Sequence, residues 1–307
     1  MQAALGIATR NLVGESPVWD AAQQRFLWLD QFGGTIHEAR RAGTGGWQES
    51  RSWQLNRPLG GLALRQQGGL LLGTGTEILI FDEESATTQT FVRLDADPAE
   101  VMLNEIKCDR LGRLWAGTRG IDVRQHGVGA LYRVDPDQTV TRLLTDISVS
   151  NGMDWSPDGR TFYYIDSPTF TVAAFECDPT AGTLKNRRTL VTFARGASAP
   201  DGMTVDREGC LWVAIPGTGQ IRRYSPDGAE LMQVHASAPV VSSCTFGGPD
   251  ERDLWITSAA IRLPDEVLSI IGVTAEQAQT WATAPGAGGT FVCTPGPRGY
   301  PAVPFAG

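Results

Sequence analysis

The sequence predicts an all-β protein folded as a six-bladed β-propeller, and two observations carry that prediction. A short apolar strand that follows a turn recurs six times, and neighbouring copies lie 43 to 49 residues apart. A second strand-like segment follows each copy. Regular units of about 40–50 residues, each with a few short strands, are typical of propeller blades.

The repeated strands can be placed one by one along the chain. The first strand of each unit is centred on Trp28, Leu71, Trp115, Tyr163, Trp212 and Trp255. The second strands cover 35–38, 78–82, 131–135, 174–178, 221–224 and 291–293. Several second strands end in Asp-Pro or Ser-Pro, which favours a turn because proline lacks a backbone donor and fixes φ.

A β-sandwich with similar turns is the alternative, but it does not require near-equal spacing six times. All-β folds of this kind can also run to 307 residues as one unit. We therefore expect a single domain over 1–307. Helix formers replace strand alternation late in the chain, which predicts an irregular insertion at about 262–285, inside the last blade.

Composition excludes several classes of partner. The formal net charge is −8 with a pI near 5.0, and no long Lys/Arg run occurs, so nucleic acid and anionic membranes are not expected partners. No apolar stretch approaches the roughly 20 residues of a membrane span, and no signal peptide is visible. Five widely spaced cysteines without a CxxC pair favour a reducing, cytoplasmic location. We expect a monomer or a small homo-oligomer that acts on a small molecule.

Three polar clusters carry the candidate chemistry. They contain Glu15 in Gly-Glu-Ser-Pro, Asn151 in Ser-Asn-Gly-Met-Asp and Asp201 in Pro-Asp-Gly-Met. These residues precede Trp28, Tyr163 and Trp212 by 13, 12 and 11 positions. Equivalent positions in a radial repeat converge on its axis, so we expect all three at the centre of the ring.

Two carboxylates and an amide form an all-oxygen ligand set. Such a set favours one divalent cation: Ca²⁺, Mg²⁺, Mn²⁺, or Zn²⁺ or Fe(II) with water ligands. Three protein ligands leave positions for water or substrate, as in catalytic sites, although a metal that only ties the blades together is the alternative. Asn104, 11 positions before Trp115, also faces inward in this alignment.

A nucleophilic triad is not expected. The chain has three histidines, none beside a plausible Ser or Cys nucleophile, and no GxSxG motif. Lys107 follows Asn104 by three positions and has two interpretations: a cation of the channel or an internal partner for a carboxylate, of which we favour the second.

Taken together, these residues resemble the regucalcin (senescence marker protein), gluconolactonase and luciferin-regenerating-enzyme family. The resemblance covers nearly the whole chain and rests on motifs in a fixed order. They are Gly14-Glu-Ser-Pro-Val-Trp19, Asn104 ahead of Lys107, Ser150-Asn-Gly-Met-Asp-Trp155, Asn186-Arg-Arg188, Pro200-Asp-Gly-Met203 and Phe305-Ala-Gly307. The resemblance implies a six-bladed propeller with one divalent metal in the central channel, and many members of this family open sugar lactones.

The resemblance also assigns roles. Glu15, Asn151 and Asp201 match the metal ligands, and Asp201 matches the proposed general base. Asn104 matches a contact to the substrate or to a water on the metal.

The substrate pocket departs from the family pattern. The family often has Arg-x-Asn-Asp-Gly-Lys where this chain has Met102-Leu-Asn-Glu-Ile-Lys107, so the arginine that holds sugar oxygens is Met102 here. Gly117-Thr-Arg119 replaces a Gly-Thr-Met motif and adds a cation near the mouth, and Asp122 is a candidate for the family's substrate-binding glutamate. Met102, Asn104, Arg119 and Asp122 are therefore the expected substrate contacts.

The leading functional hypothesis is a gluconolactonase-like hydrolase of carbohydrate metabolism that opens a sugar-acid lactone or a less hydroxylated relative. It would use a metal-polarised carbonyl and a water activated by Asp201. One alternative is a natural-product tailoring enzyme that uses the metal as a Lewis acid for isomerisation, cyclisation or elimination. The other is a non-catalytic, metal-binding regulatory propeller.

Overall fold

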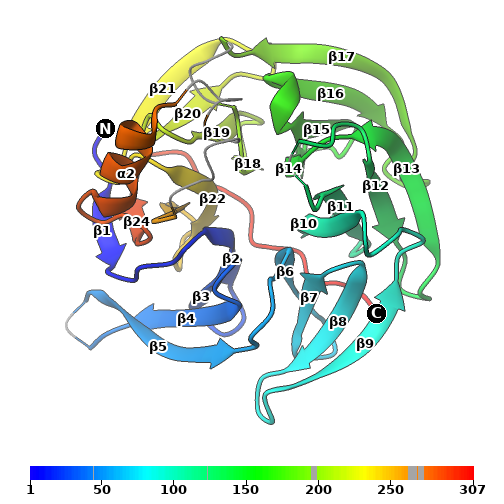
Figure 1. The fold of residues 1–307 in the computed structure, drawn as a ribbon, viewed down its shortest axis with the longest axis horizontal. Helices are drawn as coiled ribbons and strands as arrows, with labels where there is room; N and C mark the ends of the chain where they lie inside the picture. The colour runs from blue at the N-terminus through cyan, green and yellow to red at the C-terminus, as the bar shows by residue number, and fades with distance from the viewer. Residues whose placement is uncertain (44, 123, 195–198, 262–267, 269–272) are drawn as a thin grey trace.

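The computed structural model describes residues 1–43, 45–122, 124–194, 199–261, 268 and 273–307. Within them, the strands form six four-stranded antiparallel sheets arranged as blades around a centre (Figure 1). The six-bladed propeller predicted from the repeat spacing is confirmed.

Each blade begins with its innermost strand. The first three are β2 (Gly14–Asp20), β3 (Arg25–Asp30), β4 (Thr35–Arg41) and β5 (Trp47–Gln54); β6 (Gly61–Leu64), β7 (Leu70–Thr74), β8 (Glu77–Asp82) and β9 (Thr87–Arg93); and β10 (Val101–Cys108), β11 (Leu114–Gly120), β12 (Gly129–Val134) and β13 (Val140–Ile147).

The remaining blades follow the same order. The fourth and fifth are β14 (Ser150–Trp155), β15 (Thr161–Asp166), β16 (Thr171–Cys177) and β17 (Leu184–Thr192), with a 3₁₀ turn η1 (Ser167–Thr169), and β18 (Met203–Val205), β19 (Leu211–Ile215), β20 (Gln220–Tyr224) and β21 (Glu230–His235). The sixth is β22 (Val241–Gly247), β23 (Asp253–Ser258), β24 (Thr290–Cys293) and β1 (Ala4–Ile7).

The apolar strand that repeats in the sequence is the second strand of each blade, and its burial explains why it is apolar. β3, β7, β11 and β19 are buried along their whole length, because neighbouring blades cover both of their faces. They therefore read as continuous apolar runs centred on large residues. The outer strands β5 and β17 are mostly exposed and polar, which suits sheet edges that face water.

The turn before the repeated tryptophan has a specific chemistry. In the third blade, Asp109 Oδ1 accepts hydrogen bonds from two backbone amides of the turn, and its Oδ2 accepts one from Trp115 Nε1 at 2.9 Å. In the fifth blade, Asp206 does the same for Trp212, also at 2.9 Å. Gly112 supplies the positive φ that such a turn needs. In the Asp-x-x-Gly-x-Leu-Trp repeat, the aspartate side chain therefore binds both the backbone of the turn and the tryptophan that follows it.

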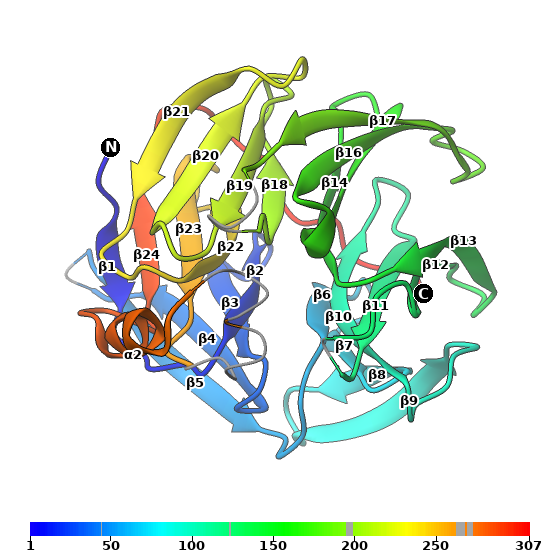
Figure 2. The same cartoon turned by 45° about the horizontal axis from the view of Figure 1, so that its top comes forward.

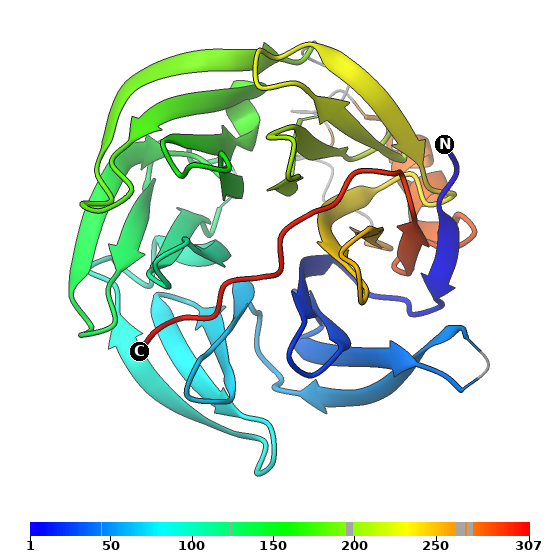
Figure 3. The same cartoon turned by 180° about the vertical axis from the view of Figure 1, so that it is seen from behind.

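The two ends of the chain close the ring. β1 pairs with β24, so the N-terminal strand completes the last blade. After β24, the C-terminal segment crosses the centre of the ring on one side, as Figure 3 shows. It ends against the second and third blades, where Phe305 is fully buried and its backbone pairs with Leu64 and Gln66.

The predicted insertion lies between β23 and β24. It includes α2 (Ala275–Thr283), which begins at a capping box made by Thr274 and Gln277. The helix lies beside β1 and β24 at the rim of the sixth blade (Figure 2). Residues 262–267 and 269–272 of the predicted insertion lie outside the described residues. No helix in the described part of the chain is both long and apolar enough to cross a bilayer.

Candidate metal and substrate site

The innermost strands bring the three sequence clusters together at the centre. Asp201 lies two residues before β18, and its carbonyl accepts a hydrogen bond of 3.2 Å from the Gly152 amide of β14. Asn151 Nδ2 donates to Ser167 Oγ at 2.7 Å, and this hydroxyl donates to the carbonyl of Pro200 at 2.6 Å. Glu15 of β2 interacts electrostatically with Asp201. The predicted ligands thus come from the first, fourth and fifth blades.

The three predicted ligands do not hold equivalent places in their inner strands. Glu15 lies inside β2 and Asn151 lies inside β14, whereas Asp201 precedes β18. Strand pairing is irregular beside Glu15 and Asn151. The register shifts between Glu15 and Val18, and again between Ser150 and Met153.

These irregularities are β-bulges, which redirect side chains and recur beside functional sites. Ser16 has a φ of 47°, an unusual value for a residue with a side chain, and its amide donates to Glu15 Oε2 at 3.0 Å. β10 has a register shift at the same level, between Leu103 and Glu105. The backbone therefore departs from regular pairing where three inner strands reach the site.

Two glycines allow the inner strands to approach one another. A Cβ at Gly152 would lie 2.7 Å from the Asp201 carbonyl oxygen. A Cβ at Gly202 would lie 2.1 Å from Ser243 Oγ of β22. Both distances are far below van der Waals contact. The glycines that follow Asn151 and Asp201 are therefore required by close packing of neighbouring inner strands around the axis.

The carboxylates at the centre destabilise each other's charge. Burial, followed by repulsion from Asp201 and Glu105, raises the pKa of Glu15 well above its ordinary value. Burial and Glu105 raise the pKa of Asp201 to about 8. Burial also raises the pKa of Glu105 to about 7, despite the opposing charge of Lys107. Three acidic groups thus share one buried region, and their mutual repulsion shows an excess of negative charge there.

Glu105 belongs to the Met102–Lys107 motif but was not among the site residues predicted from the sequence. It is 8 % exposed and lies one position after Asn104 at the bulge of β10. A signal was present, because Glu105 stands at the family position of an aspartate in Arg-x-Asn-Asp-Gly-Lys. The offset from the repeated strand centres identifies only one residue per blade. In the third blade this residue is Asn104, and its neighbour Glu105 is not identified.

The donor set fits a divalent cation. Within the described residues, Glu15 and Asp201 make no ion pair with a cationic side chain. Asn151 has its Nδ2 engaged by Ser167, and its Oδ1 already accepts a hydrogen bond of 2.9 Å from Asn104 Nδ2. The amide oxygen therefore faces away from Ser167, and a carbonyl oxygen has a second lone pair for a metal. Two carboxylates and this oxygen would hold a hard cation, whose charge would offset the repulsion.

The predicted substrate contacts divide into two groups. Asn104 and Arg119 lie together, since Arg119 Nε donates to Asn104 Oδ1 at 2.9 Å. Met102 is the Cα partner of Arg119 across β10 and β11 and is half-buried. Asp122 lies in the β11–β12 connection, where Arg124 binds both of its carboxylate oxygens and lowers its pKa to about 2. In the described residues no hydrogen bond or ion pair joins Asp122 to Asn104 or Arg119.

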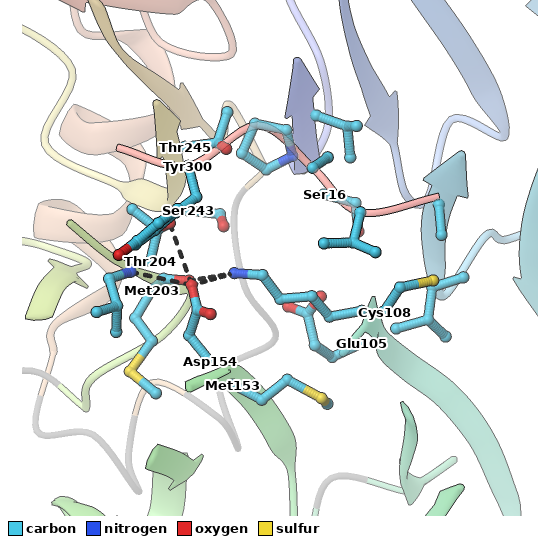
Figure 4. A pocket seen from close by; sticks show the side chains of 18 of the residues that line it. Ser16, Glu105, Cys108, Met153, Asp154, Met203, Thr204, Ser243, Thr245 and Tyr300 are labelled. Carbon is cyan, nitrogen blue, oxygen red and sulfur yellow. Dashed lines mark hydrogen bonds and ion pairs between the residues drawn. The ribbon is translucent and has the colours of Figure 1, made fainter. Parts of the chain in front are cut away.

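Lys107 is an internal partner for a carboxylate, as the sequence analysis favoured. Its Nζ lies 2.7 Å from Asp154 Oδ2, which also accepts hydrogen bonds from Thr204 and from the amide of Val205. These residues line a cavity of roughly 100 Å³ inside the ring. Figure 4 shows Glu105 and Asp154 on this cavity, with Tyr300 of the C-terminal segment on its wall. The C-terminal segment thus covers the end of the channel beyond Glu105.

A second acidic cluster lies elsewhere in the fifth blade. Asp206, Glu208 and Cys210 place one ligand atom each within 4.8 Å of one another. Arg223 binds both carboxylates, at 2.7 Å from Asp206 and 2.6 Å from Glu208. Asp206 also caps the turn before Trp212. This cluster is already neutralised by an arginine, so the centre of the ring is the better candidate for a metal site.

Comparisons with known proteins find similar sequences over nearly the whole chain. Residues 13–260 match the family described as the SMP-30/Gluconolactonase/LRE-like region. Regucalcin of Danio rerio is 36% identical, with 98% of this chain and 97% of the relative covered. A Bacillus subtilis protein named "Putative sugar lactone lactonase YvrE" is 30% identical, with 100% and 99% covered.

Solved structures give the same result for the fold. A luciferin-regenerating enzyme has a TM-score of 0.85 at 27% identity, with 97% of this chain and 96% of the other covered. A calcium-binding protein, regucalcin, from Agrobacterium tumefaciens has a TM-score of 0.85 at 24% identity, with 99% and 98% covered.

Proposed function

Because this chain belongs to the SMP-30/gluconolactonase/LRE-like family, we propose that it is a metal-dependent hydrolase that opens a lactone. The observation that carries the proposal is the pair Glu15 and Asp201, two carboxylates with raised pKa and no cationic partner among the described residues. With Asn151 they offer one divalent cation three oxygen ligands. Other coordination positions then stay open for water and substrate.

The bound cation would supply the positive charge that polarises the ring carbonyl. Asp201 accepts a proton from a water molecule while the water oxygen forms a bond to the carbonyl carbon. The ring C–O bond then breaks, and the proton passes from Asp201 to the leaving ring oxygen. The product is an open chain with one hydroxyl group and one carboxyl group. Asn104 and Arg119 orient the substrate.

The family and the ligand set leave a choice of metals and substrates. All-oxygen ligands favour Ca²⁺, and Mg²⁺, Mn²⁺, Zn²⁺ or Fe(II) with water ligands are the other candidates. A sugar-acid lactone would place the protein in carbohydrate metabolism, and Met102 favours a less hydroxylated relative. Four of the five cysteines are buried and all five are free, which supports a reducing, cytoplasmic location.

A Lewis-acid isomerase, cyclase or lyase is the second candidate. The observation that favours it is Met102, which stands where the family pattern has a substrate-binding arginine. Arg119 weakens this argument, because it keeps a guanidinium at the paired position of the neighbouring strand.

The test uses metal-stripped protein, restored ion by ion, against a panel of hydroxylated and poorly hydroxylated lactones in a pH-stat. We expect acid release only with a divalent cation. Asp201→Asn should lower turnover by about 10³-fold, the usual range for loss of a general base. Metal-independent hydrolysis, or full activity of Asp201→Asn, would contradict the proposal. Tight metal binding without acid release from any lactone would favour the second candidate or a non-catalytic regulatory protein.

A further inference from the structure

Among the described residues, Arg119 is a buried cation without an acidic partner. The described part of the chain has four arginines less than about a tenth exposed: Arg25, Arg113, Arg119 and Arg223. Arg25, Arg113 and Arg223 each form an ion pair with at least one carboxylate. Arg119 is 7% exposed, and no carboxylate of the described residues pairs with it. Three of these four buried arginines are thus neutralised within the described structure, and Arg119 is not.

The partners of Arg119 are neutral. Its Nε donates to Asn104 Oδ1 and its Nη1 donates to the carbonyl of Gly120, both at 2.9 Å. The guanidinium carbon lies 5.7 Å from the centroid of the Phe32 ring. Met102 is the residue directly opposite on β10, on the same face of the sheet. An amide, a carbonyl and apolar groups cannot balance a charge, and a guanidinium in such surroundings attracts anions strongly.

One nitrogen of Arg119 stays available. Nη2 makes no hydrogen bond within the described residues, whereas Nε and Nη1 are held in place. The two fixed nitrogens orient the guanidinium plane, because its donors form a rigid fork. The side chain is therefore preorganised to donate from Nη2 to one further acceptor.

Hydrogen bonds connect this cation to the metal ligands. Arg119 donates to Asn104, and Asn104 Nδ2 donates to Asn151 Oδ1 at 2.9 Å. Arg119 and the predicted ligand Asn151 are thus connected through one side chain, Asn104, by two hydrogen bonds. This short connection favours one ligand that contacts both Arg119 and the centre.

We propose that Arg119 binds a carboxylate of the substrate, so that the preferred lactone carries an ionised carboxylate on or near its ring. This inference rests on the proposed lactonase function and adds the substrate class to it. A carboxylate can accept hydrogen bonds from the free edge of the guanidinium and neutralise its positive charge. The apolar side chains of Phe32 and Met102 beside the guanidinium offer no hydrogen bonds that compete with the carboxylate.

The test compares two substrates that differ only in charge: γ-butyrolactone bearing a γ-carboxylate, and the corresponding carboxamide. The wild-type, metal-loaded protein should show a kcat/KM about 10- to 100-fold higher for the carboxylate, as expected for a charge-assisted hydrogen bond. Arg119→Met should reduce this ratio to about one. Arg142→Met is the control, since it removes an exposed cation from the same blade and should keep the wild-type ratio.

Two further variants separate charge recognition from misfolding. Arg119→Lys keeps the charge and should keep part of the preference. Met102→Arg in the Arg119→Met background returns a guanidinium to the paired position on β10 and should restore part of the ratio. A ratio near one in the wild type, or a ratio unchanged in Arg119→Met, would overturn the inference.

A binding measurement does not depend on turnover. Calorimetry with 3-oxocyclopentane-1-carboxylate and its carboxamide, which have no ester to hydrolyse, should show the same preference and its loss in Arg119→Met. If lactones are opened without preference for charge, and the two carbocycles bind equally, the lactonase proposal stands and this inference is wrong. If no lactone is opened but the carboxylate binds through Arg119, the anion site stands and the lactonase proposal is wrong.

Discussion

Two groups of buried carboxylates in this molecule have pKa values shifted in opposite directions. In the first blade, Arg25 binds Asp20 at 2.9 Å and Glu38 at 2.8 Å, and its Nη2 binds Glu83 of the second blade at 3.0 Å. Hydrogen bonds from Arg40, Ser50 and Arg25 overcome the cost of burial and lower the pKa of Glu38 to about 2. At the centre of the ring, burial and mutual repulsion raise the pKa values of the acidic groups instead.

The difference lies in the cations that each region supplies. The first blade places arginines among its acids, so that the charges are balanced by the chain itself. The centre has Lys107, which is paired with Asp154, while Glu15 and Asp201 have no such partner among the described residues. Charges balanced in this way stabilise the fold. Buried charges without a partner destabilise it, and the proposed metal ion would offset this cost at the centre.

The largest expected effect comes from removing one charge at the centre. Glu15→Gln should weaken divalent-metal binding by more than about 100-fold, because it removes an anionic ligand. The metal-free variant should be at least as stable as the metal-free wild type, since the repulsion with Asp201 is relieved. Calorimetric titration measures the affinity, and thermal unfolding of stripped protein measures the stability. Unchanged affinity would show that the metal lies elsewhere.

The same chemical change in the first blade should have the opposite outcome. Glu38→Gln leaves Arg25 and Arg40 with one fewer counter-charge, and breaking a buried ion pair costs about 3 kcal/mol of unfolding free energy. Metal affinity and turnover at saturating metal should not change. Denaturant unfolding of the stripped protein gives the cost. If Glu38→Gln were neutral and Glu15→Gln strongly destabilising, the division between a structural and a functional group of acids would be wrong.

The smallest expected effect is on the pH dependence of stability. The pKa values of Glu105 and Asp201 are raised to about 7 and about 8, so both groups favour folding while protonated and oppose it once ionised. The metal-free protein should therefore lose several degrees of Tm as pH rises from about 4.5 to 8. Glu38 acts in the other direction: its contribution is present above pH 4.5 and disappears as pH falls toward 2.

Scanning calorimetry between pH 5 and 8.5, with and without metal, checks this prediction. Bound metal should flatten the decline, because metal binding requires the carboxylates to be ionised. In the metal-free protein, Glu105→Gln should reduce the fall of Tm with rising pH in part. A metal-free Tm that does not vary over this interval would show that the central acids do not repel one another as described.

Much of the fold could be predicted because each blade repeats the same local chemistry. A few consecutive residues specify the turn that contains Asp109 or Asp206 and the buried strand centred on Trp115 or Trp212. The route of the C-terminal segment across the ring had no such signal. Phe305 stands in a motif of the family resemblance, but its role as an anchor depends on backbone hydrogen bonds with Leu64 and Gln66, more than 200 positions earlier.

The sequence by itself determined the ring of six blades and the residues Glu15, Asn151 and Asp201 as inward-facing candidates, because periodic spacing and local turn chemistry suffice for both. Only the tertiary structure decided which charged side chains pair with one another. It paired Lys107 with Asp154 and brought Glu105 among the central acids. Within the part of the chain that the structure describes, it also left Arg119 without a carboxylate partner. Charge balance depends on which side chains meet across blades, and residues that meet in this way are far apart in the chain.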